Sequence, residues 1–272
     1  MARPTVTFRH PPVVETVLGI QFERLPGLTN AHLGAFWERT RSDWPHVSDA
    51  PPLDEQFETF GRQPAWNRAI HLRLTQAPAA RLQMKNATGD RMVQLQNCRL
   101  DYNWIGLPDC EYPRYRIVRP EFDSVLGDFA ALVADRGLGA LVPTQWEVTY
   151  VNHMPKGSVW EGPEEWPLVF RSLPGLAAVP AGMRLEGFGG HWHFEIKPQR
   201  GRLHVELQHA FVGGAEKVEA LVMKLTARGP VDAQERSIAA ASECLDLGHD
   251  AIVTAFEQLT SERAHEYWNR QG

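Results

Sequence analysis

The sequence predicts an α+β protein made of two pseudo-repeated halves, each ordered strand, helix, antiparallel strands, helix. Three observations support this class. Runs of β-branched and apolar residues are typical of strands, tight-turn signals join neighbouring runs, and an amphipathic helix closes each half. Two such halves would join their strands into one twisted antiparallel sheet, with helices on one face and water on the other.

The first half begins with a strand pattern, "VVETVLGIQFERL", which follows Pro11–Pro12. A helix is expected to start at Thr29 or Asn30, which are both good N-cap residues, and residues 45–68 are typical of a loop-rich insertion. Further strands are expected at 68–76, 80–86, 90–96, 97–104 and 112–118. A helix over 121–137 closes the half, because its apolar residues form one stripe: Phe122, Val125, Phe129 and Leu132.

The second half follows a similar order. A strand is expected at 144–154, and Pro167 limits a helix within 162–173 to a turn or two. Further strands are expected at 182–188, 191–198, 202–211 and 218–229. A long helix over 246–268, with Asp246 as its N-cap, closes the chain.

The two halves match in pattern and order more than in identity. Glu15 in the first strand corresponds to Glu147, and the hairpin at 80–97 corresponds to the one at 191–209. An internal duplication is therefore predicted, with halves at 1–140 and 141–272 that form one compact unit.

Composition excludes several classes of protein. The chain has 272 residues, 43% of them hydrophobic, and a net charge of −5, so it has no overall basic field for nucleic acid. No apolar run approaches the roughly 20 residues that cross a bilayer, and no apolar signal segment begins the chain. Cys98, Cys110 and Cys244 form no CxxC pair, which argues against a disulfide framework or zinc ribbon. We expect a cytoplasmic protein with reduced thiols and no cofactor.

The stretch "HWHFEIKPQRGRLHVELQH" at 191–209 is the strongest candidate for a site. A hairpin turn near 199–201 would place apolar partners on one face, where they are expected to form one buried core patch: Ile196 with Leu203, Phe194 with Val205, and Trp192 with Leu207. The other face would pair His191 with Gln208, His193 with Glu206, and Glu195 with His204. His209 would fall on the apolar side.

The first-half hairpin gives the same alternation with different chemistry. Leu82 and Met84 are expected to face Leu95 and Val93, which leaves basic and amide groups on the polar side. If the sheets are continuous, the two polar sides share one surface. The candidate ligand-binding residues are Gln83, Lys85, Gln94, Gln96, Glu147, His153, His191, His193, His204 and Glu206.

Histidine beside carboxylate on neighbouring strands is also the chemistry of a metal or acid–base site. His191, His193, His204 and Glu206 are the candidate metal ligands, because strand neighbours lie close enough to converge. Cross-strand pairing on a solvated sheet explains the same residues without a metal, and this interpretation is favoured. No nucleophile elbow, P-loop or dinucleotide glycine pattern is present, so no catalytic residue is assigned.

Three other features have structural interpretations that are favoured over functional ones. His249 lies on the apolar stripe of the last helix, as a hydrogen-bonded core residue would. "GFGG" at 187–190 is typical of a flexible turn. Trp104 and Tyr112, beside Arg114 and Arg116, could stack nucleic-acid bases but are more typical of core packing.

The chain also resembles a known family. The segments "PPVVETVLGIQF", "VQLQNCRLDYNW" and "YPRY" match the PPxxE, QxQ…NW and YPxY signature of a sporadically distributed bacterial family of uncharacterised function. The resemblance covers nearly the whole chain. One departure is Ile105, where the family often has Arg after the NW pair. The resemblance implies no activity, because none is established for that family.

Two classes of function remain after these exclusions. The favoured hypothesis is a non-enzymatic binding or scaffold protein that recognises a protein, a peptide or a small polar ligand through the open sheet face. The alternative is a metal-dependent or acid–base enzyme centred on the His/Glu cluster. Nucleic-acid binding through Arg81, Lys85, Arg91 and Arg99 is a weaker alternative, no membrane partner is expected, and an oligomer is compatible with the sequence.

Overall fold

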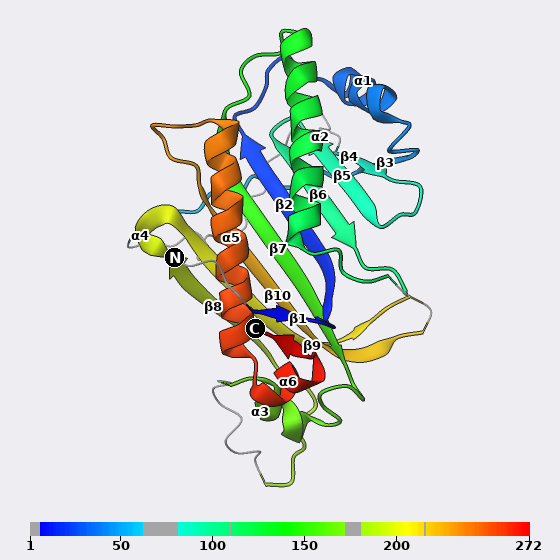
Figure 1. The fold of residues 1–272 in the computed structure, drawn as a ribbon, viewed down its shortest axis with the longest axis vertical. Helices are drawn as coiled ribbons and strands as arrows, with labels where there is room; N and C mark the ends of the chain where they lie inside the picture. The colour runs from blue at the N-terminus through cyan, green and yellow to red at the C-terminus, as the bar shows by residue number, and fades with distance from the viewer. Residues whose placement is uncertain (1–5, 62–80, 109, 172–180, 215) are drawn as a thin grey trace.

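The fold is one large antiparallel sheet with two long helices across one face, in the computed structural model, which describes residues 6–61, 81–108, 110–171, 181–214 and 216–272 (Figure 1). The sheet has nine strands in the order β3-β4-β5-β6-β2-β7-β10-β9-β8. A separate two-stranded sheet pairs β1 (Thr7–Phe8) with β11 (Arg270–Gln271), near the two ends of the chain. The predicted α+β class with helices on one face is confirmed.

Each half contributes four neighbouring strands around the centre of the sheet, and β3 extends one edge. The first half contains β2 (Val13–Phe22), α1 (Asn30–Thr40), β3 (His46–Ala50), β4 (Arg81–Lys85), β5 (Arg91–Gln96), β6 (Arg99–Ile105) and α2 (Tyr115–Asp135). The second half contains β7 (Pro143–Pro155), η2 (Pro163–Glu165), α3 (Trp166–Val169), β8 (Gly189–Ile196), α4 (Lys197–Arg200), β9 (Gly201–Val212), β10 (Val218–Pro230), α5 (Ile238–Leu259) and α6 (Glu262–Tyr267).

The central pair, β2 and β7, has the register of a local two-fold relation. Val17 pairs with Thr149, Glu15 pairs with Val151, and Gly19 pairs with Glu147. The alignment of the two halves that matches Glu15 with Glu147 also matches Gly19 with Val151. A two-fold rotation about the Val17–Thr149 pair would therefore place each of these strands on the other. The strand order outward from the centre is also equivalent on both sides.

The core lies between the sheet and the long helices. Phe122 and Phe129 on α2, and Leu245 and Ile252 on α5, are fully or almost fully buried. Each such side chain stabilises the fold by about 1.5–3 kcal/mol relative to an exposed one. Gly248 lets α5 approach the sheet closely, because a Cβ there would lie 2.5 Å from the Trp146 ring.

The two hairpins differ in how well their sequences predict the register. In β4–β5, Leu82 pairs with Leu95 and Met84 with Val93, as predicted. In β8–β9 the predicted register is wrong by two residues, which keeps every residue on its predicted face. The observed pairs are Phe194 with Leu203, Trp192 with Val205, His191 with Glu206, His193 with His204, and Glu195 with Arg202. Residues 197–200 form the connection, with positive φ at Lys197 and Gln199 and a proline between them, so the turn is centred earlier than expected.

The prediction that Trp192 and Phe194 are buried in the core is wrong for Phe194 and is met only in part by Trp192, which packs against the core. Trp192 is only partly buried and Phe194 is 44% exposed, whereas Ile196, Leu203, Val205 and Leu207 are buried as expected. The reason is position: β8 is the edge strand, and α5 packs on β7, β10 and β9 instead. An edge strand without a helix above it leaves its apolar side chains partly exposed.

Several element boundaries differ from the expectation. Residues 115–118 begin α2 instead of forming the predicted strand. Residues 182–188 also do not form the strand predicted there. α5 begins at Ile238, because Ser237 accepts a hydrogen bond from the Ala240 N–H at 3.1 Å and caps it there. Residues 46–50 form β3 within the predicted loop. The strand predicted at 68–76 lies outside the described residues. No helix of the described chain is long and apolar enough to cross a membrane.

Candidate functional site: the polar face of the sheet

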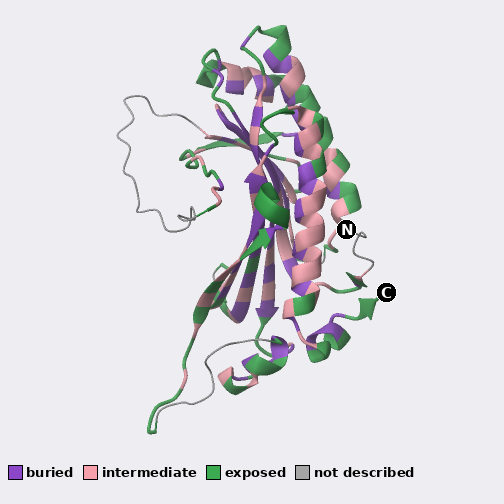
Figure 2. Ribbon diagram, turned by 90° about the vertical axis from the view of Figure 1, so that its left-hand side faces the viewer, coloured by how far each residue is buried: buried purple, intermediate pink, exposed green. Residues whose placement is uncertain are grey.

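The face of the sheet turned away from the helices is polar across almost its whole width. Figure 2 shows the two long helices on one side of the sheet only. Odd-numbered residues of β2, β6 and β7 and even-numbered residues of β9 and β10 point to the other side, according to the strand registers. Several of these polar residues are nevertheless buried: Gln21, Arg99, Asp101, Asn103, Gln145, Thr149, Arg202 and Thr226.

An ion network occupies the centre of this face. The Arg99 guanidinium contacts the Asp101 carboxylate at 2.7 Å and the Glu147 carboxylate at 2.9 Å. Arg228 contacts the other oxygen of Glu147 at 3.1 Å. Gly19 makes room for this network, because a Cβ there would lie only 2.2 Å from Asp101 Oδ1. The glycine is therefore required by the packing of charged side chains.

Glu58 extends the network from a loop. Its carboxylate is 0% exposed and contacts three side chains of β9 and β10. Arg228 lies at 2.9 Å, His204 Nε2 lies at 2.6 Å, and Arg202 forms a further ion pair. Burial alone would raise the pKa of Glu58, but the hydrogen bond from His204 and the charge of Arg228 lower it to about 2. Glu58 thus remains an anion, held between two arginines and a histidine.

The other two carboxylates respond differently to burial. Burial raises the pKa of Asp101 to about 6, against the opposing charge of Arg99. Burial acts on Glu147 in the same sense, but Arg99 and Arg228 together hold its pKa below the usual value. A carboxylate with two arginine partners therefore stays ionised more readily than one with a single partner.

Glu58 belongs to an extended segment, residues 53–60, which we call the strap. The side-chain amide of Gln96 on β5 accepts from the Leu53 N–H at 3.0 Å and donates to the Leu53 carbonyl at 2.9 Å. The amide of Gln21 on β2 bonds Gln56 in the same way, at 2.8 and 2.7 Å. Gln145 on β7 accepts from the Glu58 N–H at 3.1 Å. The strap therefore crosses the polar face from β5 toward β9.

This geometry copies the pairing of one strand with another. A carboxamide that bonds both the N–H and the C=O of one residue supplies the donor and acceptor that a neighbouring strand would supply. Gln21 and Gln96 read only the backbone of the strap, so these contacts do not depend on its sequence. Side-chain selectivity comes from the Glu58 carboxylate and from Phe60, whose ring lies 4.9 Å from the Arg202 guanidinium.

Three of the predicted site residues take part in this arrangement. Glu147 and His204 belong to the ion network, and Gln96 holds the strap. Gln94 donates to the Asn103 side chain at 2.8 Å and accepts from Arg81 and Gln83. His193 lies next to them, with its Nδ1 2.8 Å from His204 Nδ1.

The remaining predicted residues lie outside the network. Lys85 and His191 are exposed, and Glu206 is bonded to Gln208. Burial lowers the pKa of His153, which lies farther along β7. Among the described residues no three His, Cys, Asp or Glu side chains come together as metal ligands. His191, His193, His204 and Glu206 are neighbours on two strands, but they do not converge on one point.

Sequence reasoning missed most of the ion network. Arg202 and Arg228 are charged residues at polar-face positions of clear strands, so strand alternation is the signal that could have identified them. Asp101 and Arg99 could have been found in the same way. Glu58 carries no such signal, because only the path of the strap brings it to the sheet.

The residues considered for nucleic-acid binding are mostly engaged elsewhere. Arg91 pairs with Glu121 at 2.7 Å, Arg99 is buried, and Arg81 bonds Gln94. Trp104 is 2% exposed and packs against Tyr112, with ring centroids 5.0 Å apart. Trp104 is therefore part of the core and does not offer a stacking surface.

Comparison with known proteins adds little to the geometry. No family model matches the chain, and no curated protein does. Among solved structures, the di-domain ARO/CYC StfQ from the steffimycin biosynthetic pathway aligns over 93% of this chain and 97% of its own, with 8% identity and a TM-score of 0.18. A TM-score this low does not establish a common fold.

Proposed function

We propose that this protein is a non-enzymatic binding protein whose polar sheet face recognises an extended acidic segment of a partner protein. The strap is the internal occupant of that surface, and a partner segment would take its place. The partner is a protein or peptide in preference to a nucleic acid, because the surface forms hydrogen bonds with backbone amides and binds a carboxylate.

The observation that carries the proposal is the double hydrogen bonding of strap residues by Gln21 and Gln96. Extended peptides are commonly recognised through main-chain hydrogen bonds that give affinity and side-chain pockets that give specificity. Here the glutamines supply the first part, and the Arg202, Arg228 and His204 group supplies the second.

A peptide competition experiment tests this function. The strap residues 53–58 are replaced by glycine and serine at the same length, and a labelled peptide with the sequence of residues 51–61 is added. We expect the peptide to bind the strap-replaced protein and to bind the wild type much more weakly. A peptide with Glu58→Gln should lose about tenfold or more in affinity, because charge-assisted hydrogen bonds are lost.

A matched peptide provides the control. Among the described residues, Glu55 forms an ion pair with the exposed Arg24 at 2.6 Å, so a peptide with Glu55→Gln should bind almost as well as the original. The proposal fails if no peptide binds the strap-replaced protein, or if both glutamine peptides lose the same affinity.

Acid–base chemistry is a second candidate, and one arrangement favours it. Glu58 contacts His204 Nε2 at 2.6 Å, and His204 Nδ1 faces His193 Nδ1 at 2.8 Å. A carboxylate that orients a histidine is a common part of general-base sites. Hydrolysis of a panel of esters, amides and phosphate esters that is lost in His193→Gln, but kept in His191→Gln, would support an enzyme over a binding protein.

We also propose that residues 1–140 and 141–272 descend from a duplication of one ancestral unit. The register of β2 and β7 and the equivalent strand order on both sides support this origin. The duplication places a cationic and amide surface beside a histidine and carboxylate surface on one sheet. Membership of the uncharacterised bacterial family remains a prediction from the sequence motifs.

A further inference from the structure

A cavity of about 730 Å³ lies on the opposite side of the sheet from the strap. Its floor is formed by β7 and β10, its walls by the first turns of α2 and the middle of α5, and residues 6–13 border it. Small-molecule sites in proteins typically enclose about 300–1,000 Å³. The cavity is therefore large enough for an organic ligand, and it is independent of the polar-face site.

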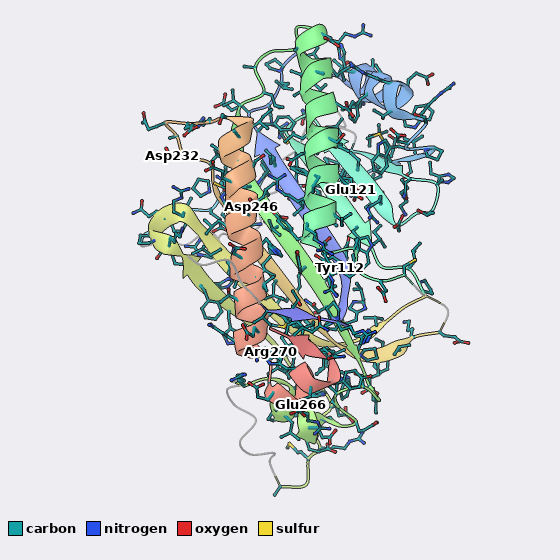
Figure 3. All side chains as sticks on the ribbon, viewed as in Figure 1. Tyr112, Glu121, Asp232, Asp246, Glu266 and Arg270 are labelled. Atoms are coloured by element: carbon teal, nitrogen blue, oxygen red, sulfur yellow. The ribbon has the colours of Figure 1, made fainter. Side chains whose placement is uncertain are left out.

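Hydrogen-bonding groups converge on this cavity from three elements. The hydroxyls of Tyr112 and Tyr150 are 2.9 Å apart, and Tyr150 lies 2.9 Å from His249 Nδ1. The Tyr115 hydroxyl donates to Asp246 Oδ1 at 2.7 Å, and its ring stacks on His249 with 3.9 Å between centroids. Figure 3 labels Tyr112 below α2 and Asp246 on α5.

The tyrosines of the cavity remain protonated at neutral pH. Burial raises the pKa of Tyr112 to about 12, and burial together with Tyr112 raises the pKa of Tyr150 well above its usual value. Their hydroxyls are thus hydrogen-bonding groups for a ligand and not bases. Such a cavity is suited to holding a ligand more than to removing a proton from it.

Two arginines at the start of α2, Arg114 and Arg116, line one wall of the cavity. Among the described residues neither forms an ion pair with a carboxylate, whereas Arg119 on the same wall pairs with Asp123. Arg114 donates to the main-chain oxygen of Arg9 at 3.2 Å and lies 5.7 Å from the centre of the Tyr112 ring. Its φ of +75° is costly for a residue other than glycine, so the surrounding structure imposes its position.

The α5 wall carries carboxylates. Asp246 is bonded by Tyr115 and lies 3.6 Å from Arg119, which also pairs with Asp123. Asp250 lines the same wall. An anionic group in the cavity is attracted to Arg114 and Arg116 on the opposite wall. Apolar residues complete the lining, and they include Phe8, Val13, Ile252, Val253 and Phe256.

We infer that this cavity binds a small organic anion whose charged group contacts Arg114 and Arg116 and whose aromatic or aliphatic body lies against Phe8 and Phe256. The ligand needs both an anionic group and an apolar body, because the arginines line one end of the cavity and apolar side chains line the other.

Calorimetric titration of the full chain with 4-phenylbutyrate and with its neutral amide, 4-phenylbutanamide, tests the inference. The carboxylate should bind at least tenfold more tightly than the amide. The double variant Arg114→Gln/Arg116→Gln should lose about tenfold per arginine for the carboxylate, and little for the amide. Arg136→Gln, at the exposed far end of α2, is the matched control and should bind as the wild type does.

A second variant separates binding in the cavity from binding elsewhere. Val253→Trp fills the cavity from α5 and should abolish binding of both compounds, with thermal unfolding measured alongside to show that the variant is folded. The inference is overturned if neither compound binds the wild type, if the amide binds as tightly as the carboxylate, or if folded Val253→Trp binds both unchanged.

Discussion

The two faces of the sheet are built from the same strands but are stabilised in different ways. On the helix face, Trp146, Val148 and Leu225 are buried against helices by non-directional apolar contacts. On the polar face, Arg99 is buried and the Glu147 side chain is 14% exposed, and the two charges lie within 3 Å of each other. Apolar contacts tolerate side chains of similar volume, whereas a buried ion pair fails when one partner is removed. The polar face should therefore be more sensitive to charge and pH.

The largest expected effect comes from placing a charge on the helix face. Val205→Asp buries a carboxylate at a position that is 2% exposed and has no partner for it. We expect a loss of more than about 4 kcal/mol of unfolding free energy, which would leave little folded protein. Circular dichroism during urea unfolding measures this. Glu206→Ala, the next residue along β9 on the polar face, is the control and should retain a cooperative transition.

Removing a partner from the ion network comes next. Glu147→Ala leaves Arg99 facing only Asp101 and deprives Arg228 of one of its two carboxylates. We expect a loss of about 3–5 kcal/mol of unfolding free energy in urea titrations. Glu235→Ala, at an exposed site, should change stability by less than about 0.5 kcal/mol. Equal effects of the two variants would show that the network contributes no more than a surface charge does.

Acid should weaken the polar face through Glu58. Its pKa is lowered in the folded state to about 2, so its contribution is fully present above its usual pKa and is lost as pH falls from about 4.5 toward 2. The shift corresponds to about 3 kcal/mol of unfolding free energy. Asp101 acts in the opposite sense, because its raised pKa favours the folded state as pH falls below about 6.

Urea unfolding between pH 7 and pH 2 measures both contributions. Glu58→Gln should flatten the loss of stability below pH 4.5, while the wild type and an exposed-site variant, Glu235→Gln, should lose stability in parallel. If Glu58→Gln shows the same acid profile as the wild type, Glu58 is not held as an anion.

The smallest expected effect concerns the attachment of the strap. Gln21→Ala removes two hydrogen bonds to Gln56 and should cost about 1–3 kcal/mol locally, with less effect on global unfolding. Hydrogen exchange at the Gln56 amide should become faster, because that amide loses its acceptor. Gln208→Ala, which is exposed on β9, should leave exchange in the strap unchanged.

The two hairpins show what sequence alternation can and cannot predict. Strand period two placed every hairpin side chain on its correct face in both halves, because a face depends only on odd or even position. The pairing in β8–β9 depended on the turn, where Lys197 and Gln199 take left-handed backbone conformations that no glycine signals. Register was thus predictable in β4–β5, where Gly89 marks the turn, and not in β8–β9.

The candidate site was predictable to a similar extent. Glu147, His204, Gln94 and Gln96 were correctly assigned to one polar face from alternation alone. The contacts of the polar face with the strap were not predictable, since they span 35 residues to Gln21 and 146 residues to His204. Local patterns carry no information about where an irregular segment of this kind will lie.

The central position of β2 and β7 has a consequence for the synthesis of the chain. β2 ends at Phe22 and its partner β7 begins at Pro143, so a ribosome must add about 120 residues before this pair can form. At about 5–20 residues per second, translation leaves one edge of β2 without its partner for roughly 6–24 seconds. An unpaired apolar strand edge invites association with other chains. Newly made protein should therefore depend on slow, chaperone-assisted maturation. Synonymous codon changes that delay translation before residue 143 should increase aggregation, although the amino-acid sequence stays the same.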